Sequence, residues 1–400
     1  MSSAFELATA TRVVFGAGKA SLLAEWLSEL GVTRLLAVSG KDTGRAGAVW
    51  SALDARGMRY ERCIVEGEPS VELVRGGTKA CVALGAQAVI AVGGGSAIDA
   101  GKAIAALAPS GSDPLDHLEV VGRGLPLRAP PLPFAALPTT AGTGAEVTRN
   151  AVLSSREHGV KASLRSALML PRLAIVDPDF LIGAPSAVLR ASGLDALSQL
   201  IEPFVSVRAN PLSDALAREG LVRSRRSLEH AVQHGPDETQ REDLALASLF
   251  GGLCLANAGL GAVHGFAAPL GGMFEAPHGA VCAALLPHVM RVNLRALRAA
   301  GADTQVARYR ELAQLLTDER EAEAEAGIVW VERLCRVLEV PGLGAYGMRA
   351  EHVPELIAKA ASASSMRGNS IVLAASELTE IALSALAGVS SGHGDRTAIP

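Results

Sequence analysis

Aromatic residues, cysteines and long apolar runs are all scarce in this sequence. Only 4% of its 400 residues are aromatic, and its five cysteines form no CxxC pair. No stretch of about 18 uninterrupted apolar residues is present to span a bilayer, and no basic leader precedes an apolar run at the N-terminus. We therefore expect a cytoplasmic protein with reduced, buried thiols rather than redox or ligand cysteines. The cysteines are Cys63, Cys81, Cys254, Cys282 and Cys335.

The charge balance also excludes some partners. A formal net charge of -4 gives no electrostatic reason to expect nucleic acid or an anionic membrane as a partner. A hydrophobic content of 49% with 20% charged residues is typical of a soluble globular protein. Because 400 residues exceed one ordinary core, the length predicts two domains.

The first part of the chain alternates strand-like and helix-like stretches. This alternation predicts a parallel, doubly wound sheet. The stretch 151–164 is different, because it has the pattern of a strand, a turn and a second strand. Apolar runs that end at glycine or proline predict buried strands at 33–40, 60–65, 86–93, 133–140 and 171–178, with helices at 47–56 and 71–85.

The hydrophobic pattern of the sequence changes after Pro178. Long amphipathic stretches with helical periodicity follow, and strand-like runs are absent. Gly183 and Pro185 in the segment LIGAPSA precede the first of these helices. We therefore place the boundary at residue 182, with an α/β domain over residues 1–182 and an all-α domain over residues 183–400.

Two glycine-rich loops follow predicted strands. Gly93, Gly94 and Gly95 stand between a strand and a helix, where bare backbone amides suit a pyrophosphate. The second loop, 139–144, repeats this logic. Either loop alone could be a structural turn, but two on one sheet predict a dinucleotide site. Neither is GxGxxG and no Walker motif is present, which disfavours an ordinary Rossmann fingerprint and a P-loop.

Both loops also carry the spacing of a capping box. Ser96 and Asp99 stand three residues apart at the start of the first predicted helix, and Thr143 and Glu146 repeat that spacing. A capping box satisfies two free amides at a helix N-terminus. We therefore expect these pairs to fix the first turns that follow the loops.

Three of the nine histidines fall close together in an apolar stretch. His264, His278 and His288 lie among glycines and apolar residues, where an imidazole needs a partner. Asp195 and Gln199 stand four residues apart in a helical stretch, so their side chains leave the same face. We expect these groups to form the chemical site. The alternative is that the histidines are hydrogen-bonded polar groups that line a pocket.

The ordered motifs resemble those of the iron-containing, or group III, alcohol dehydrogenase family, which includes lactaldehyde reductases and maleylacetate reductases. They are GAGK, GGGSAIDAGKA, LPTTAGTGAEVT, AIVDP, GLDAL, two histidines fourteen residues apart, and LPHVMRVN. The resemblance covers nearly the whole chain. It implies a nucleotide-binding α/β domain with a parallel sheet, an all-α metal and substrate domain, and an active site between them. It also implies hydride transfer between a nicotinamide cofactor and a small aldehyde or ketone, with the alcohol as the other partner of the reaction.

The resemblance also assigns residues. Metal ligands would be Asp195, Gln199, His264 and His278, holding Fe²⁺ or Zn²⁺, with His264 and His278 as catalytic residues. Lys161 would lie near the cofactor ribose. The full set implied for the cofactor is Gly40, Lys41, Gly94, Gly95, Ser96, Asp99, Thr139, Thr140, Thr143 and Lys161.

Three positions depart from the family pattern. Gln199 replaces the usual histidine, and Ala268 stands where many members keep a histidine beside the substrate. Gly40 replaces an aspartate that would repel a 2′-phosphate, and Lys41 and Arg45 follow it. The missing aspartate at Gly40 and the positive charges after it favour NADP(H) over NAD(H), although Asp42 could instead accept hydrogen bonds from the ribose.

Three alternative functions stay open. One is a maleylacetate-type keto-acid reductase that works without metal. The others are a dehydroquinate-synthase-like lyase with recycled NAD, and an inactive nucleotide-binding relative. Family membership would also imply a homodimer.

Overall fold

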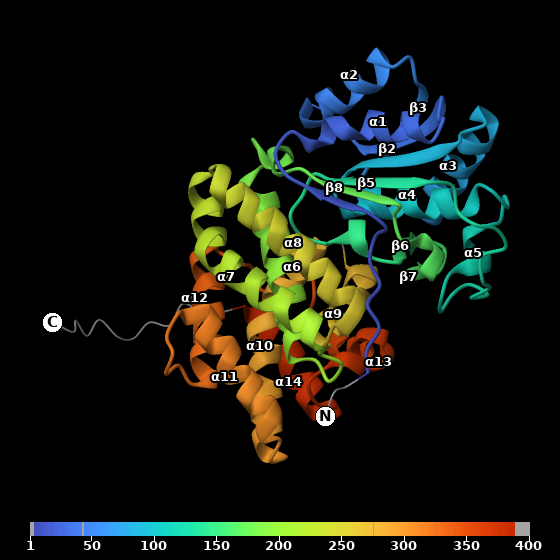
Figure 1. Cartoon of the computed structure of the whole chain (residues 1–400). Helices are drawn as coiled ribbons and strands as arrows, with labels where there is room; N and C mark the ends of the chain where they lie inside the picture. The colour runs from blue at the N-terminus through green and yellow to red at the C-terminus, as the bar shows by residue number, and fades with distance from the viewer. Residues whose placement is uncertain (1–3, 42–43, 275, 389–400) are drawn as a thin grey trace.

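The computed structural model describes residues 4–41, 44–274 and 276–388. Asp42, a possible partner of the cofactor ribose, lies outside them. A β-sheet flanked by helices occupies one side of the molecule, and a cluster of helices occupies the other (Figure 1). This is the predicted fold class, an α/β domain followed by an all-α domain, and it is confirmed.

The sheet of the N-terminal domain has six parallel strands in the order β1-β8-β5-β4-β2-β3. Residues of β4 and β5 are buried throughout, because helices cover both faces of the sheet. Five of the strands were predicted from glycine- or proline-ended apolar runs, whereas β1 was not. The strands are β1 (Val13–Phe15), β2 (Arg34–Gly40), β3 (Arg59–Val65), β4 (Ala88–Gly93), β5 (Phe134–Pro138) and β8 (Leu173–Val176).

Helices pack on both faces of this sheet (Figure 1). One face carries α1 (Leu22–Glu29) and α2 (Gly47–Ala55), and the other carries α3 (Val71–Leu84) and α4 (Gly95–Leu107). The short helix α5 (Pro114–His117) follows α4. Two separate apolar cores result, one on each face, which is the doubly wound arrangement that the alternation predicted.

An antiparallel hairpin stands apart from the main sheet. Strands β6 (Asn150–Ser155) and β7 (Val160–Arg165) pair with each other and pack against α4 and, in the helical domain, against α9. This hairpin is the predicted strand, turn and strand. It connects the nucleotide side of the molecule with the helical side.

The two predicted capping boxes are wrong. The N-cap of α4 is Gly94 rather than Ser96, and no side chain caps this end. The Asp99 carboxylate instead accepts a hydrogen bond from the backbone N–H of Val152 at 2.9 Å, because β6 packs beside α4. After the second loop, Gly144 begins a single 3₁₀ turn in place of Thr143. Thr143 Oγ1 there accepts from the N–H of Ala145 at 3.3 Å.

The C-terminal domain is helical, and among its described residues no strand occurs. The division at residue 182 stays a prediction. It falls between a 3₁₀ turn (Pro178–Leu181) and the first long helix. The helices are α6 (Ser186–Val205), α7 (Pro211–His234), α8 (Glu238–Ala258), α9 (Ala262–Met273), α10 (His278–Ala299), α11 (Asp303–Thr317), α12 (Ala324–Val337), α13 (Val353–Ser362) and α14 (Ala375–Ala387).

Helix α10 is apolar because it is the centre of this domain. Its 22 residues have the length and hydropathy of a membrane span, but 78% of the apolar window is buried inside the protein. Helices α8 and α9 also pass that test as a pair, yet they are bent by 99° at the break between them. We therefore interpret α10 as a core helix, and the bend as what turns α9 back toward the centre of the domain.

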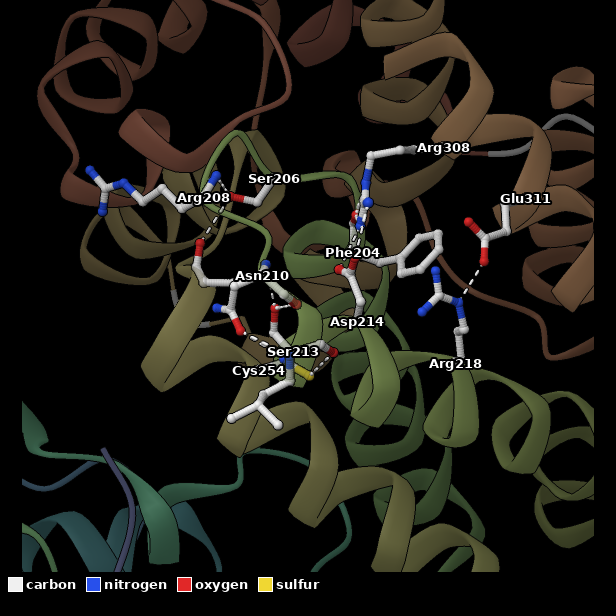
Figure 2. A network of polar contacts seen from close by, with 12 residues as sticks. Phe204, Ser206, Arg208, Asn210, Ser213, Asp214, Arg218, Cys254, Arg308 and Glu311 are labelled. Carbon is white, nitrogen blue, oxygen red and sulfur yellow. Dashed lines mark hydrogen bonds and ion pairs between the residues drawn. The ribbon is translucent and has the colours of Figure 1, made fainter. Parts of the chain in front are cut away.

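A polar network fixes the C-terminal end of α6, which carries part of the site (Figure 2). The Arg308 guanidinium from α11 donates to the carbonyl of Phe204 at 2.6 Å and to Asp214 of α7 at 3.0 Å. It also lies 4.6 Å from the centre of the Phe204 ring. Asn210 caps α7 by accepting from the N–H of Ser213 at 3.1 Å. These contacts hold α6, α7 and α11 as one unit.

Two glycines allow the two domains and the helices of the site to meet closely. Gly144 has a φ of 58°, and a Cβ there would lie 2.3 Å from the Cα of Gly252 on α8. Gly279, near the start of α10, approaches α6 so closely that a Cβ would lie 2.0 Å from the carbonyl oxygen of Ala191. No residue larger than glycine fits either place without moving backbone.

Candidate functional site

Three helices bring the candidate metal ligands together. Asp195 comes from α6, His264 from α9 and His278 from the first position of α10. Asp195 Oδ1 lies 3.4 Å from His264 Nε2 and 3.8 Å from His278 Nε2, and the centres of the two imidazole rings are 5.4 Å apart. The structure brings these three residues together.

Cys282 joins this cluster, although the sequence analysis assigned it no ligand role. Its Sγ lies 3.7 Å from Nε2 of both His264 and His278, and its side chain is fully buried. The potential ligand atoms of Asp195, His264, His278 and Cys282 all lie within 4.8 Å of one another. The signal in the sequence was the spacing, because Cys282 follows His278 by four residues on one helix face.

Glu202 is a second residue that sequence reasoning missed. Its Oε2 lies 2.7 Å from Nδ1 of His264, and its Oε1 accepts a hydrogen bond from the N–H of Val263 at 2.7 Å. A carboxylate on Nδ1 fixes the imidazole so that Nε2 faces the other ligands. Glu202 follows Asp195 by seven residues, two turns along the same face of α6, so helical spacing could have found it.

The charges in this cluster are strongly coupled. Burial lowers the pKa of His264, but the neighbouring Cys282, Asp195 and Glu202 outweigh it and raise that pKa well above its usual value. The pKa of His278 is raised to about 9, chiefly by Cys282. Burial raises the pKa of the Cys282 thiol, and the two imidazoles more than reverse this shift. The charged forms of these groups therefore stabilise one another in a buried space.

The donor set fits a divalent metal ion. Asp195 Oδ1 is buried, and within the described part of the chain no hydrogen bond satisfies it. The same holds for Oε1 of Gln199, one turn further along α6. Buried polar atoms without partners mark a place for another group, and a carboxylate with two imidazoles is a common ligand set for Fe²⁺ and Zn²⁺.

His288 and Ala268 do not belong to this cluster. His288 follows His278 by ten residues on α10, and neither of its ring nitrogens has a partner among the residues described. The expectation that each of the three histidines needs a partner is therefore wrong for His288. Ala268 follows His264 by one turn of α9 and is exposed.

The two glycine loops meet at the carboxyl ends of neighbouring strands. Gly93 ends β4, and its carbonyl accepts from the N–H of Thr139 at the end of β5. A Cβ on Gly94 would lie 3.3 Å from Thr140 Oγ1, and one on Gly95 would lie 2.7 Å from the Thr143 methyl group. The loops therefore form one surface around the uncapped N-terminus of α4.

Gly40 lies beside this surface at the end of β2. A Cβ on Gly93 would lie 3.4 Å from the Gly40 nitrogen. Lys41 is exposed and pairs with Glu66 at 3.4 Å. Arg45, which was expected to add positive charge here, instead donates to the carbonyls of Thr139 and Phe180 at 3.2 and 3.0 Å. It therefore braces the second loop.

Lys161 lies at the junction between the domains. Its Nζ is 3.0 Å from Glu68, and its side chain is 12% exposed. A Cβ on Gly271 of α9 would lie 2.8 Å from that Nζ, so β7 and α9 are in contact here. Lys161 therefore stands beside the helix that carries His264.

Asp99, the last of the cofactor candidates, has its contacts elsewhere. Besides Val152, its carboxylate lies 3.7 Å from the buried Lys102 ammonium. That ammonium donates to the carbonyls of Ala145 and Asn150 at 2.7 and 2.8 Å. These bonds hold the second loop and the hairpin against α4.

Comparisons with known proteins agree with this geometry. The profile described as "Iron-containing alcohol dehydrogenase" matches residues 10–178. The profile described as "Fe-containing alcohol dehydrogenase family, C-terminal" matches residues 190–386. Together the two profiles account for both domains.

Individual relatives support the same assignment. The chain is 34% identical to the lactaldehyde reductase of Escherichia coli (strain K12) over 360 residues, which is 86% of this chain and 89% of that protein. It is 35% identical to alcohol dehydrogenase 4 of Saccharomyces cerevisiae (strain YJM789) over 291 residues, 71% of this chain and 75% of that one.

Solved structures are similar over nearly the full length. The crystal structure of a 1,3-propanediol oxidoreductase has a TM-score of 0.88 and 31% identity, covering 96% of this chain and 100% of that one. A sulfoacetaldehyde reductase from Bifidobacterium kashiwanohense, solved with NAD⁺, has a TM-score of 0.85 and 26% identity, covering 96% and 99%. The relatives are oxidoreductases, which favours this class over the lyase and the inactive relative. The chain belongs to the iron-containing alcohol dehydrogenase family and is an alcohol dehydrogenase or aldehyde reductase.

Proposed function

We propose that this enzyme reduces a small aldehyde or ketone with NADPH at the junction of its two domains. Asp195, His264 and His278 would hold a divalent metal, and the glycine loops would hold the cofactor. The observation that carries this proposal is the convergence of these three side chains around the unsatisfied Asp195 Oδ1. The substrate class follows from the relatives, which act on small alcohols and aldehydes.

The cofactor residues have separate tasks in this proposal. The free amides at Gly95 and Ser96 would receive the pyrophosphate at the N-terminus of α4. Thr139, Thr140 and Thr143 would contact the cofactor along the second loop. Gly94 would allow its close approach, and Lys161 would reach the ribose. Asp99 would act indirectly, by helping to hold the second loop and the hairpin in place. Its carboxylate contacts the N–H of Val152 in the hairpin and the ammonium of Lys102.

The metal would supply Lewis acidity that polarises the substrate carbonyl while the nicotinamide supplies hydride. The protein residues orient the ligands and exclude water. Glu202 holds His264 with Nε2 inward. Burial raises the pKa of Asp195, but the neighbouring His278 and His264 outweigh it and hold that pKa below its usual value, which favours the carboxylate. Ala268 has no titratable group and so cannot donate a proton as a histidine would. The proton that completes the alcohol would therefore come from solvent, which reaches this exposed position.

The preference for NADPH follows from the charges around Gly40. Lys41 is exposed beside it, and the Arg62 guanidinium donates to Ser39 Oγ at 3.0 Å, one residue before it. Two cations beside Gly40 would suit the 2′-phosphate of NADP(H). Lys41, which pairs with Glu66 at 3.4 Å, would exchange that partner for the phosphate.

A kinetic experiment tests the reductase and its cofactor together. Oxidation of NADPH and NADH is followed with a panel of small aldehydes, ketones and keto acids. We expect turnover with at least one carbonyl and a higher kcat/KM for NADPH. Gly40→Asp should lower kcat/KM for NADPH by about 10–100-fold, since a nearby like charge costs about 1–3 kcal/mol, and should spare NADH. No turnover with any carbonyl would contradict the proposal.

One alternative is favoured by a specific residue. Gln199 is a weaker metal ligand than the histidine expected there. An enzyme that works without metal, such as a maleylacetate-type keto-acid reductase, would tolerate this change. The metal content of the purified enzyme separates the two, because the keto-acid reductase would work without a bound ion. We further propose a cytoplasmic homodimer. The cytoplasm agrees with five free thiols, and the dimer stays a prediction from the family.

A further inference from the structure

Cys282 is a buried core residue whose thiol also faces the histidines of the candidate site. It lies on α10 one turn after His278, with its Sγ directed at Nε2 of two imidazoles from different helices. Both of these nitrogens are the ones that Asp195 Oδ1 also approaches. Four potential ligand atoms therefore face one point, and each comes from a buried or half-buried side chain.

Four of the six separations between these atoms are close to those of a tetrahedral metal site. With metal–nitrogen bonds of about 2.0–2.1 Å and a metal–sulfur bond of about 2.3 Å, neighbouring ligand atoms lie about 3.3–3.6 Å apart. The measured separations are 3.4 and 3.8 Å from Asp195 Oδ1 to the imidazoles and 3.7 Å from Cys282 Sγ to each. Small rotations of the side chains would complete the geometry.

A second, independent observation also points to an ion. Asp195 Oδ1 is buried and, in the described ranges, accepts no hydrogen bond, although its residue is only 2% exposed. Its neighbours are the imidazoles of His264 and His278 at 3.4 and 3.8 Å, and a buried carboxylate oxygen without a hydrogen bond is stabilised by a cation placed among these groups. Glu202 further fixes His264 so that only Nε2 is directed to this point.

We propose that Cys282 is the fourth protein ligand of the metal. It would replace the histidine that the family usually has at the position of Gln199. The ligand set would then be Asp195, His264, His278 and Cys282. On binding, the protons held by Cys282 Sγ and by Nε2 of His264 and His278 would leave to solvent, and Sγ–metal and Nε2–metal bonds would form in their place, with no change of oxidation state. A thiolate among the donors shifts the preference toward Zn²⁺ over Fe²⁺. This inference rests on the proposed metal-dependent reductase.

X-ray absorption of the zinc-loaded full-length enzyme tests the proposal directly. We expect one sulfur neighbour at about 2.3 Å from zinc in the wild type. The sulfur should be absent in Cys282→Ser and retained in Cys63→Ser, a matched control in the sheet domain. Zinc surrounded only by nitrogen and oxygen in the wild type would overturn the inference and leave the reductase intact. If Cys282→Ser does not fold, the wild-type spectrum alone decides.

Zinc affinity provides a second readout that does not depend on activity. Loss of a partner outside the ligand set weakens metal binding by about 10–100-fold, so Cys282→Ser should weaken zinc by about 100-fold or more. Adding Gln199→His to Cys282→Ser should restore affinity to within about tenfold, because it supplies a new donor. A packing role for Cys282 would leave Cys282→Ser with the zinc affinity of the wild type, which would overturn the proposal. If the wild-type enzyme reduces carbonyls without binding metal, the ligand role of Cys282 and the metal dependence of the proposed function are both wrong.

Discussion

His288 is a buried residue whose polarity the surrounding helices do not satisfy. It is 8% exposed, and burial, followed by the charge of Arg291, lowers its pKa to about 4. Between about pH 6.5 and 4 the unfolded chain therefore takes up a proton that the folded protein does not. Stability should be full above pH 6.5 and fall as the pH drops through this window.

Replacing His288 by leucine should remove this pH dependence. The folded protein loses about 2 kcal/mol at pH 5 relative to pH 8 through this group, so His288→Leu should raise Tm more at pH 5 than at pH 8. Thermal melts at the two pH values measure the difference, with the exposed His230→Gln as a control. An equal shift of Tm at both pH values would contradict the explanation.

Individual site residues differ in how far the sequence could predict them. Asp195, His264 and His278 follow from the motifs. Glu202 and Cys282 stand at helical spacing from two of these residues, but spacing alone does not say which face of a helix turns inward. Only the packing of α9 against α10 brings Cys282 to His264. Helical spacing alone therefore could not have assigned Cys282 to the site.

Among the elements, the second glycine loop packs tightly against α8 and so brings the two domains into close contact. Gly144→Ala would place a Cβ 2.3 Å from the Cα of Gly252, in a backbone conformation of positive φ. We expect a loss of about 2–4 kcal/mol from the free energy of unfolding, from both clash and backbone strain. Urea denaturation measures this loss.

Gly159 provides the control for this variant. It has a φ of 61°, and a Cβ there would meet no atom within 4 Å. Gly159→Ala should therefore cost only about 1–2 kcal/mol, the backbone term alone. Equal losses for the two variants would mean that the contact with α8 does not limit this position.

Elements with strong sequence patterns were predicted correctly, and the exceptions have physical causes. Buried strands such as β4 show uninterrupted apolar runs. Strand β1 has three residues, too few to show a pattern, and forms only because β8 offers it a partner. The capping boxes failed because glycine took the N-cap of α4, and the hairpin drew Asp99 to β6.

For the whole molecule, a few close contacts join the two domains and the helices of the candidate site. Gly144 brings the second glycine loop onto α8 and Gly279 brings α10 onto α6. Lys161 joins the hairpin to α9. The sequence predicted both domains because their periodicities differ. It could not predict these crossings, which depend on contacts between distant segments.

The metal content of the enzyme, purified without chelators, tests the central claim most directly. Elemental analysis should find about one divalent metal ion per chain in the wild type. His278→Ala should lose the ion together with carbonyl reduction, because its imidazole is one of the converging potential ligands. His288→Leu, on the same helix, should keep both. Wild-type protein without metal that reduces carbonyls at full rate, or His278→Ala that retains the ion, would contradict the account.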